Sequence, residues 1–258
     1  MLGVPALLGL QSGHAVTYAG RRPGVELVRR LVAPEASVDL DGPGAAICFR
    51  EAADGTFDRI ICVGPPPFDP GHTPFTQLST KAAGQRKWRE WCAAAGVGEP
   101  HMPLATTQPG PPALLIAPGS GSLDKNWPTK YFARLASEHA QHAEVFVLMG
   151  PAEEERGLLD HWRGLGGPGR IVQSPGPDDL LALFRRAPLF LGNDSGLTHL
   201  AGLFDLRGIV IFTASDPAVW APPGTRLRLL GGPGHPPEFE EIEQALEREW
   251  RSSAICAI

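Results

Sequence analysis

The chain has 258 residues and a formal net charge of −5 at pH 7, with a sequence pI near 5.9. This charge argues against a protein whose whole surface is basic, so we expect no nucleic-acid partner. The four cysteines show no paired short spacing, so they support neither a zinc site nor a disulfide framework. No apolar run is long enough to span a membrane. These two features predict a soluble, cytoplasmic protein.

The first hundred residues predict a small α/β domain. Short apolar runs at 15–19, 45–49 and 59–64 are typical of strands, and the pattern GVELVRRLV at 24–32 is typical of a helix. The stretch GEPHMPLATTQPGPPA, residues 98–113, has five prolines and no apolar period, which indicates a linker. We therefore place an N-terminal domain on the acceptor side of the protein at residues 1–105.

Strand and helix patterns alternate five times after the linker. The predicted strands are ALLIA, EVFVLMG, RIVQ, LFLG and GIVIFT, and helical patterns begin near Pro128, Glu153, Pro177 and Gly196. This alternation predicts a parallel sheet with helices on both faces, a Rossmann-like domain over residues 113–235. A last helix is predicted at residues 236–252, and the fold class is α/β with two Rossmann-like domains.

The stretch GNDSGLTHLAG, residues 192–202, contains Asp194, Ser195 and His199 within six positions. A catalytic triad does not fit, because triad members normally come from separate segments. One Asp and one His give at most two metal ligands, so we expect no metal site. The stretch follows a predicted strand and begins a predicted helix, with Ser195 or Asp194 as N-cap. Such a helix start can bind a phosphate, and the alternative is a well-capped helix without a ligand.

The stretch APGSGSLDKNWP, residues 117–128, lies between the first predicted strand of the second domain and its first helix. Its small residues would let a diphosphate approach the backbone, and Lys125 supplies a positive charge. It is not a Walker A loop, because Lys125 follows Asp124 and not a Gly. An ordinary βα turn is the alternative. Both stretches follow strands of one predicted sheet, so they can face one ligand from two sides.

Together these segments resemble the ADP-heptose lipopolysaccharide heptosyltransferases, glycosyltransferases of family 9 with the two-domain GT-B fold. The similar segments are PGSGS, KNWP, LMGPAEEE, LFLGNDSGLTHLAG and SDPAVWAPPG. The resemblance covers residues 113–224 strongly and the first hundred residues loosely. It implies that a hexosyl or heptosyl group is transferred with inversion from an ADP- or UDP-sugar, with ADP-heptose as the first candidate. The acceptor would be a lipopolysaccharide-type or other glycan, and the reaction would need no cofactor or metal. The alternatives are a catalytically impaired nucleotide-sugar-binding relative and a sugar-nucleotide epimerase.

The resemblance also implies which residues bind the donor. Lys125 would neutralise the diphosphate, and Ser120 would hydrogen-bond its oxygens. Asp194 would accept hydrogen bonds from sugar hydroxyls, and His199 would lie near the diphosphate or the sugar. The complete set of expected donor-binding residues is Ser120, Gly121, Ser122, Lys125, Glu154, Asp194, Ser195, Gly196, Thr198 and His199.

The family uses a Glu after the second strand of this domain to bind ribose hydroxyls. The segment PAEEER offers Glu153, Glu154 and Glu155, of which we assign Glu154. The alternative is that all three form a solvated, acidic first helical turn.

The family's catalytic base is an Asp in a Gly-Asp turn that follows a first strand and precedes a helix beginning near Pro-Ala-Leu. Here PALLGL matches at Pro5, Ala6 and Leu7, so by spacing the Asp would fall before Met1. We therefore expect no catalytic base within the chain, and an N-terminal domain that lacks its first strand.

The segment KAAGQRKWREW combines basic and aromatic side chains. If exposed, it could meet a lipid-linked glycan acceptor and make a peripheral contact with the inner face of a membrane. The alternative is a surface helix whose tryptophans face inward. The side chains concerned are Lys81, Arg86, Lys87, Trp88, Arg89 and Trp91.

Overall fold

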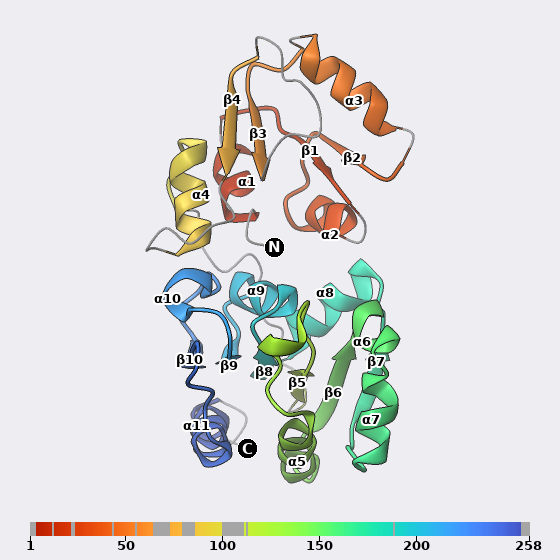
Figure 1. Cartoon of the computed structure of the whole chain (residues 1–258), viewed down its shortest axis with the longest axis vertical. Helices are drawn as coiled ribbons and strands as arrows, with labels where there is room; N and C mark the ends of the chain where they lie inside the picture. The colour runs from red at the N-terminus through yellow and green to blue at the C-terminus, as the bar shows by residue number, and fades with distance from the viewer. Residues whose placement is uncertain are drawn as a thin grey trace. The chain divides into compact units, whose positions relative to one another are not determined.

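The structure, a computed structural model, describes residues 4–11, 13–21, 24–42, 44–54, 56–63, 73–78, 86–99, 111, 113–187 and 189–253. The chain divides into two compact units, Met1–His101 and Met102–Ile258, and each is described by itself (Figure 1).

The first unit pairs short parallel strands and surrounds them with helices. Strand β1 pairs with β2, and β3 pairs with β4. Its elements are α1 (Val4–Gln11), β1 (Thr17–Gly20), α2 (Gly24–Leu31), β2 (Ala36–Asp39), α3 (Gly44–Ala53), β3 (Ile60–Val63), β4 (Phe75–Leu78) and α4 (Lys87–Ala95). Strands β1 and β3 and helix α2 confirm the sequence predictions, whereas β2 and β4 carried no recognisable signal.

One predicted strand of the first unit is wrong, because residues 45–49 belong to helix α3. Buried Ala45 and Cys48 are three positions apart, which is the spacing of one helix face. The run of five apolar residues fits a strand or a buried helical segment equally well. The helix formers of REAA, which follow it, extend the segment beyond the length of a short strand.

Helix α4 buries the two tryptophans for which the sequence suggested a contact with a membrane. Trp88 is 5% exposed and Trp91 is 6% exposed, and Trp88 packs with Ala6, Cys92 and Ala95. The alternative of inward-facing tryptophans is therefore the correct one, and neither indole is available to a membrane surface. Lys81 of the same segment lies outside the described residues.

The second unit contains one six-stranded parallel sheet in the order β10-β9-β8-β5-β6-β7 (Figure 1). Strands β5 to β9 confirm the predicted strands, and β10 was missed. Their bounds are β5 (Ala113–Ala117), β6 (Glu144–Met149), β7 (Arg170–Gln173), β8 (Leu189–Asn193), β9 (Arg207–Phe212) and β10 (Leu227–Gly231). The chain leaves β5 toward β6 and β7 and then returns to pair β8 with β5, so the strand order reverses between β5 and β8.

Helices of the second unit cover the sheet. Buried side chains of α5, α7 and α11 share a core with β5, β6, β8 and β9, and Phe184 of α8 contacts Phe190 of β8. The helix expected near Glu153 is two short helices, separated by Gly157 at φ 70°. The helical bounds are η1 (Leu123–Lys125), α5 (Thr129–His139), α6 (Pro151–Glu155), α7 (Leu158–Gly164), α8 (Pro177–Arg186), α9 (Gly196–Leu203), α10 (Pro217–Trp220) and α11 (Phe239–Ser252).

Trp127 ties the start of α5 to the start of α11. Its side chain is 2% exposed, and its indole Nε1–H donates to the carbonyl oxygen of Pro237 at 2.9 Å. The ring stacks on Phe239 with a centroid separation of 6.3 Å and meets Phe132 edge-on at 5.4 Å. This side chain therefore links the loop after β5 to the core of the unit.

We expect Trp127→Ala to lower the free energy of unfolding by about 3 to 5 kcal/mol, because it removes a large buried ring and a buried hydrogen bond. Urea denaturation of the full chain, followed by far-UV circular dichroism, measures the change. Leu123→Ala is the matched control, since Leu123 is 68% exposed, and we expect it to change the stability by less than about 0.5 kcal/mol. A loss below about 1 kcal/mol for Trp127→Ala would contradict this packing.

Candidate functional site

The candidate site lies where β5 and β8 end side by side. Ala117, the last residue of β5, is paired with Gly192 near the end of β8. The carboxyl ends of neighbouring parallel strands, at the point where the strand order reverses, are where α/β folds bind ligands. The two segments singled out in the sequence, residues 117–128 and 192–202, therefore meet at this edge of the sheet.

Asn193 holds the loop after β5 at both of its ends. Its side chain is fully buried. The Asn193 Nδ2 donates to the carbonyl oxygen of Pro118 at 2.7 Å, and its Oδ1 accepts from the backbone N–H of Trp127 at 3.1 Å. Sequence reasoning assigned Asn193 no role, because nothing in the order of residues shows which distant backbone groups an amide will meet.

The turn between β8 and α9 is fixed by side-chain hydrogen bonds to the backbone. Of the two N-cap candidates, Asp194 and Ser195, the structure has Ser195 as the N-cap of α9. Its Oγ accepts a hydrogen bond from the N–H of Thr198 at 3.4 Å. The Thr198 hydroxyl donates to the carbonyl oxygen of Asn193 at 2.5 Å. Helix α9 then begins at Gly196, so its first backbone N–H groups lie at the end of β8.

An ion pair joins the two segments. Lys125 Nζ lies 2.8 Å from Asp194 Oδ2, and the side chains are 33% and 5% exposed. Ser215 donates its hydroxyl to the same carboxylate oxygen at 2.5 Å, and the ring of Trp220 lies 5.8 Å from Lys125 Nζ. A nearly buried carboxylate needs such partners, because removal from water disfavours its charge. Ser215 and Trp220 come from the SDPAVW segment, in which the sequence suggested no particular residue.

His199 is buried beside this ion pair. The residue is 6% exposed, and no described group hydrogen-bonds its Nδ1. Burial lowers the pKa of His199 to about 4, with a smaller contribution from the Lys125 ammonium in the same direction and an opposing one from the Asp194 carboxylate. The imidazole is therefore neutral at pH 7, and its Nδ1 is buried without a hydrogen-bond partner among the described residues.

The loop after β5 is shaped by its own side chains. Ser120 is 3% exposed, and its Oγ lies 2.6 Å from the carbonyl oxygen of Ser122 and 2.7 Å from Asn126 Oδ1. Ser122 and Asp124 are also hydrogen-bonded through their side chains. The hydroxyl of Ser120 is thus engaged inside the loop, which leaves the backbone N–H groups and Lys125 as the groups best suited to an anion.

The three glutamates after β6 have different surroundings. Glu153 Oε2 accepts from the N–H of Gly150 at 2.9 Å, whereas Glu154 Oε1 accepts from the Ser174 hydroxyl at 2.8 Å. Gly119 of the loop after β5 packs directly on Glu153, since a Cβ there would come within 2.2 Å of Glu153 Cγ. Glu155 is exposed. The glutamate that meets the loop is therefore Glu153, whereas the expectation that Glu154 binds the donor stays a prediction.

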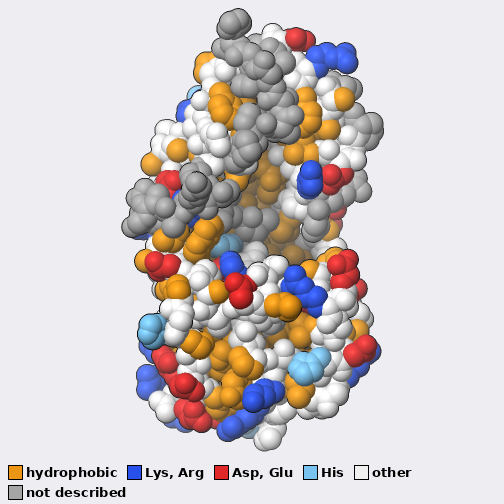
Figure 2. All heavy atoms as spheres, in the orientation of Figure 1, with side chains coloured by type: hydrophobic (Ala, Val, Ile, Leu, Met, Phe, Trp, Pro, Cys, Tyr) orange, Lys and Arg blue, Asp and Glu red, His pale blue; other side chains and the backbone are white. Residues whose placement is uncertain are grey.

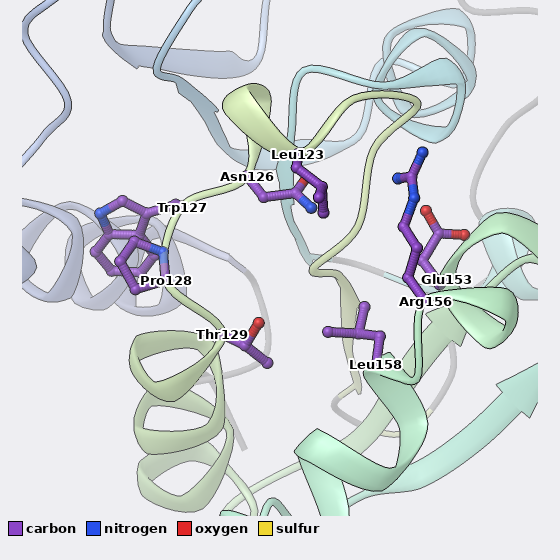
Figure 3. Close-up of a pocket in the computed structure, with 8 residues that line it drawn as sticks. All are labelled: Leu123, Asn126, Trp127, Pro128, Thr129, Glu153, Arg156 and Leu158. Atoms are coloured by element: carbon purple, nitrogen blue, oxygen red, sulfur yellow. The ribbon is translucent and has the colours of Figure 1, made fainter.

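A pocket of about 240 Å³ lies between the loop after β5 and the segment from α6 to α7 (Figure 3). Glu153 and Arg156 form one wall, and Trp127, Pro128 and Thr129 lie across from them at the start of α5. Leu123, Asn126 and Leu158 complete the lining. Glu154 is not among the lining residues.

The described residues form neither a metal site nor a membrane span. No group of three or more His, Cys, Asp and Glu side chains is placed to bind a metal ion. None of the described helices combines the length and apolar composition needed to cross a bilayer. On the face shown in Figure 2, acidic and basic side chains of the second unit are interspersed and form no broad patch of one sign.

Comparison with known proteins places the chain in a family and in a fold. The family model described as glycosyltransferase family 9 (heptosyltransferase) matches residues 85–247. No curated protein matches the chain by sequence. Solved structures, three of which are described below, share its fold at low sequence identity and confirm the predicted α/β fold of the GT-B type.

The first of these structures is the ADP-heptose lipopolysaccharide heptosyltransferase II of E. coli, with 14% identity and a TM-score of 0.74 over 98% of this chain and 95% of that one. The E. coli heptosyltransferase WaaC with ADP has 16% identity and a TM-score of 0.70 over 96% and 95%. The iron-containing heptosyltransferase TibC from enterotoxigenic E. coli, in complex with ADP-D-beta-D-heptose, has 15% identity and a TM-score of 0.57 over 96% and 73%.

We expect the buried imidazole of His199 to make folding stability depend on pH. The pKa of His199 is about 4 when folded and near 6.5 when unfolded, so the unfolded chain binds more protons between these values. The free energy of unfolding should therefore decrease as the pH drops from about 6.5 toward 4. In His199→Gln this decrease should be smaller than in wild type by about 2 to 3 kcal/mol.

Urea denaturation at several pH values measures this dependence. His161→Gln, which removes an exposed imidazole on α7, should retain the wild-type profile. Identical profiles for wild type and His199→Gln would show that His199 is not held neutral in the folded protein.

Proposed function

The chain belongs to glycosyltransferase family 9, the heptosyltransferases, and we propose that its second unit binds a nucleotide-diphosphate sugar, with ADP-heptose as the preferred donor. The sugar is transferred, with inversion, to a lipopolysaccharide-type or other glycan acceptor that the first unit would bind. The observation that carries the proposal is the meeting of Lys125 with the Asp194–Ser195 turn, 69 residues away, at the point where the strand order reverses.

The chemistry of the proposed reaction explains why these groups suit it. An acceptor oxygen attacks the anomeric carbon while the bond from that carbon to the diphosphate breaks, so negative charge grows on the leaving nucleoside diphosphate. Lys125 and the N–H groups at the start of α9 supply positive charge and hydrogen-bond donors for that group. No step of this displacement requires a metal ion.

Asp194 and His199 suit the sugar side of the donor. A carboxylate repels a phosphate, so we assign Asp194 to accept hydrogen bonds from sugar hydroxyls, with Lys125 shared between its carboxylate and the diphosphate. Neutral His199 can donate or accept a hydrogen bond without adding charge. The remaining expected residues, Gly121, Ser122, Gly196 and Thr198, would act mainly through the backbone that they shape.

Glu153 is a better candidate than Glu154 for the ribose hydroxyls. It lines the pocket and packs under the loop after β5, whereas the carboxylate of Glu154 is bound to Ser174. The base that activates the acceptor is not assigned to any residue of this chain.

We expect Lys125→Ala to weaken ADP binding about 10- to 150-fold, equivalent to about 1.5 to 3 kcal/mol, because it removes a charge-assisted contact and leaves the Asp194 carboxylate unneutralised near the diphosphate. Calorimetry gives the dissociation constant, and the thermal unfolding midpoint shows whether the variant is folded. Lys130→Ala is the matched control, since Lys130 lies on α5 with its Nζ 4.9 Å from the Tyr131 ring. Equal ADP affinity in wild type and Lys125→Ala would refute the assignment of Lys125.

We also expect ADP to bind equally well with and without EDTA, because Lys125 and backbone N–H groups supply the positive charge in the proposed site. The question matters because TibC, which shares the fold, is an iron-containing enzyme. Calorimetry on the metal-stripped protein, with and without added Mg²⁺, Mn²⁺ or Fe²⁺, tests it. Binding that appears only with a divalent cation would mean that the donor site is metal-dependent.

A further inference from the structure

We propose that Arg156 is a positioning residue that directs the backbone N–H of Gly121, in the loop after β5, toward the diphosphate of the donor. The proposal rests on the proposed function, because it assumes that a diphosphate binds at this loop. It concerns a residue to which neither the sequence patterns nor the resemblance assigned a role.

Arg156 reaches the loop from the neighbouring strand connection. It follows helix α6, and its guanidinium donates from Nη1 to the carbonyl oxygen of Ser120 at 2.8 Å and from Nη2 to that of Gly121 at 3.0 Å. Figure 3 shows its side chain rising beside Glu153 toward this loop. One side chain thus holds two consecutive carbonyls of a segment 35 residues earlier in the chain.

Holding those carbonyls also fixes the direction of a backbone donor. In a trans peptide the C=O of one residue and the N–H of the next point in opposite directions. The Ser120 carbonyl faces Arg156, so the N–H of Gly121 faces the other side of the loop. The N–H of Ser122 is engaged differently, since it donates to Ser120 Oγ at 3.3 Å. Gly121 N–H is therefore the group that Arg156 orients.

The strand order determines what lies on that other side. Strand β5 has β6 on one side and β8 on the other. Arg156 follows β6, whereas Asp194 and the start of α9 follow β8. An N–H directed away from Arg156 is therefore directed toward the edge where Lys125 and Asp194 meet, which is the proposed position of the diphosphate.

The identity of the side chain matters for this role. A guanidinium presents two parallel N–H donors in one rigid plane, whereas an ammonium is a single point that cannot hold two carbonyls in the same geometry. Among the described residues no carboxylate forms an ion pair with Arg156, so its charge also adds to the positive potential around the loop. Glu153 packs against Gly119 from the same connection and keeps the loop close to α6.

The test compares Arg156→Ala and Arg156→Lys with Arg163→Ala, which removes an exposed arginine from the adjacent helix α7. Calorimetry gives the dissociation constant for ADP, and ligand-observed NMR gives that for adenosine. We expect Arg156→Ala to bind ADP about tenfold more weakly, with adenosine binding unchanged, and Arg156→Lys to recover only part of the loss. Methylguanidinium should restore ADP binding to Arg156→Ala and have no effect on Arg163→Ala.

Other outcomes would overturn the inference in distinguishable ways. Equal ADP affinities for wild type and both Arg156 variants would show that Arg156 is an ordinary surface residue. An equal loss of ADP and adenosine binding, or full recovery by Arg156→Lys, would indicate general support of the fold or simple charge. If wild type itself binds no ADP, the proposed function fails, and the inference fails with it.

Discussion

Parallel pairing of β5 with β8 is the constraint on which the candidate site depends. It brings together the ends of two strands that β6 and β7 separate along the chain. The fully buried amide of Asn193 then holds both ends of the loop after β5, through Pro118 and Trp127. Apart from Glu153, which follows β6, the donor-binding residues that we propose in the second unit are placed by this pairing or by the turns that follow it.

Charge balance at this edge follows from the same pairing. Asp194 is almost completely buried, and a buried carboxylate is stable only if its charge is compensated. Lys125 provides the opposite charge and Ser215 donates a hydrogen bond to the carboxylate, and the two residues follow the ends of different strands. Because Lys125 remains one third exposed, its ammonium can face a ligand while still neutralising Asp194. The neutral imidazole of His199 adds a polar group without disturbing this balance.

The sheet of the second unit was largely predictable, and the first unit was less so. Strands β5 to β9 each contain a short apolar run, and several are bounded by Gly or Pro, which is typical of buried parallel strands. In the first unit the same criterion misassigned residues 45–49, since an apolar run of five also fits one face of helix α3. The tryptophans of α4 show a related limit, because aromatic residues among basic ones fit a buried face as well as a membrane contact.

The sequence by itself determined the α/β class and singled out the two segments of the candidate site, with Lys125, Asp194 and His199 as proposed donor-binding residues and either Asp194 or Ser195 as the cap of α9. These depend on local patterns, which short-range backbone chemistry dictates. Only the tertiary structure decided that Lys125 pairs with Asp194, that Glu153 and not Glu154 meets the loop, and that Asn193, Ser215 and Arg156 hold the site together. These contacts join residues from the ends of different strands, and the order of strands in the sheet, which no local pattern encodes, determines which of them become neighbours.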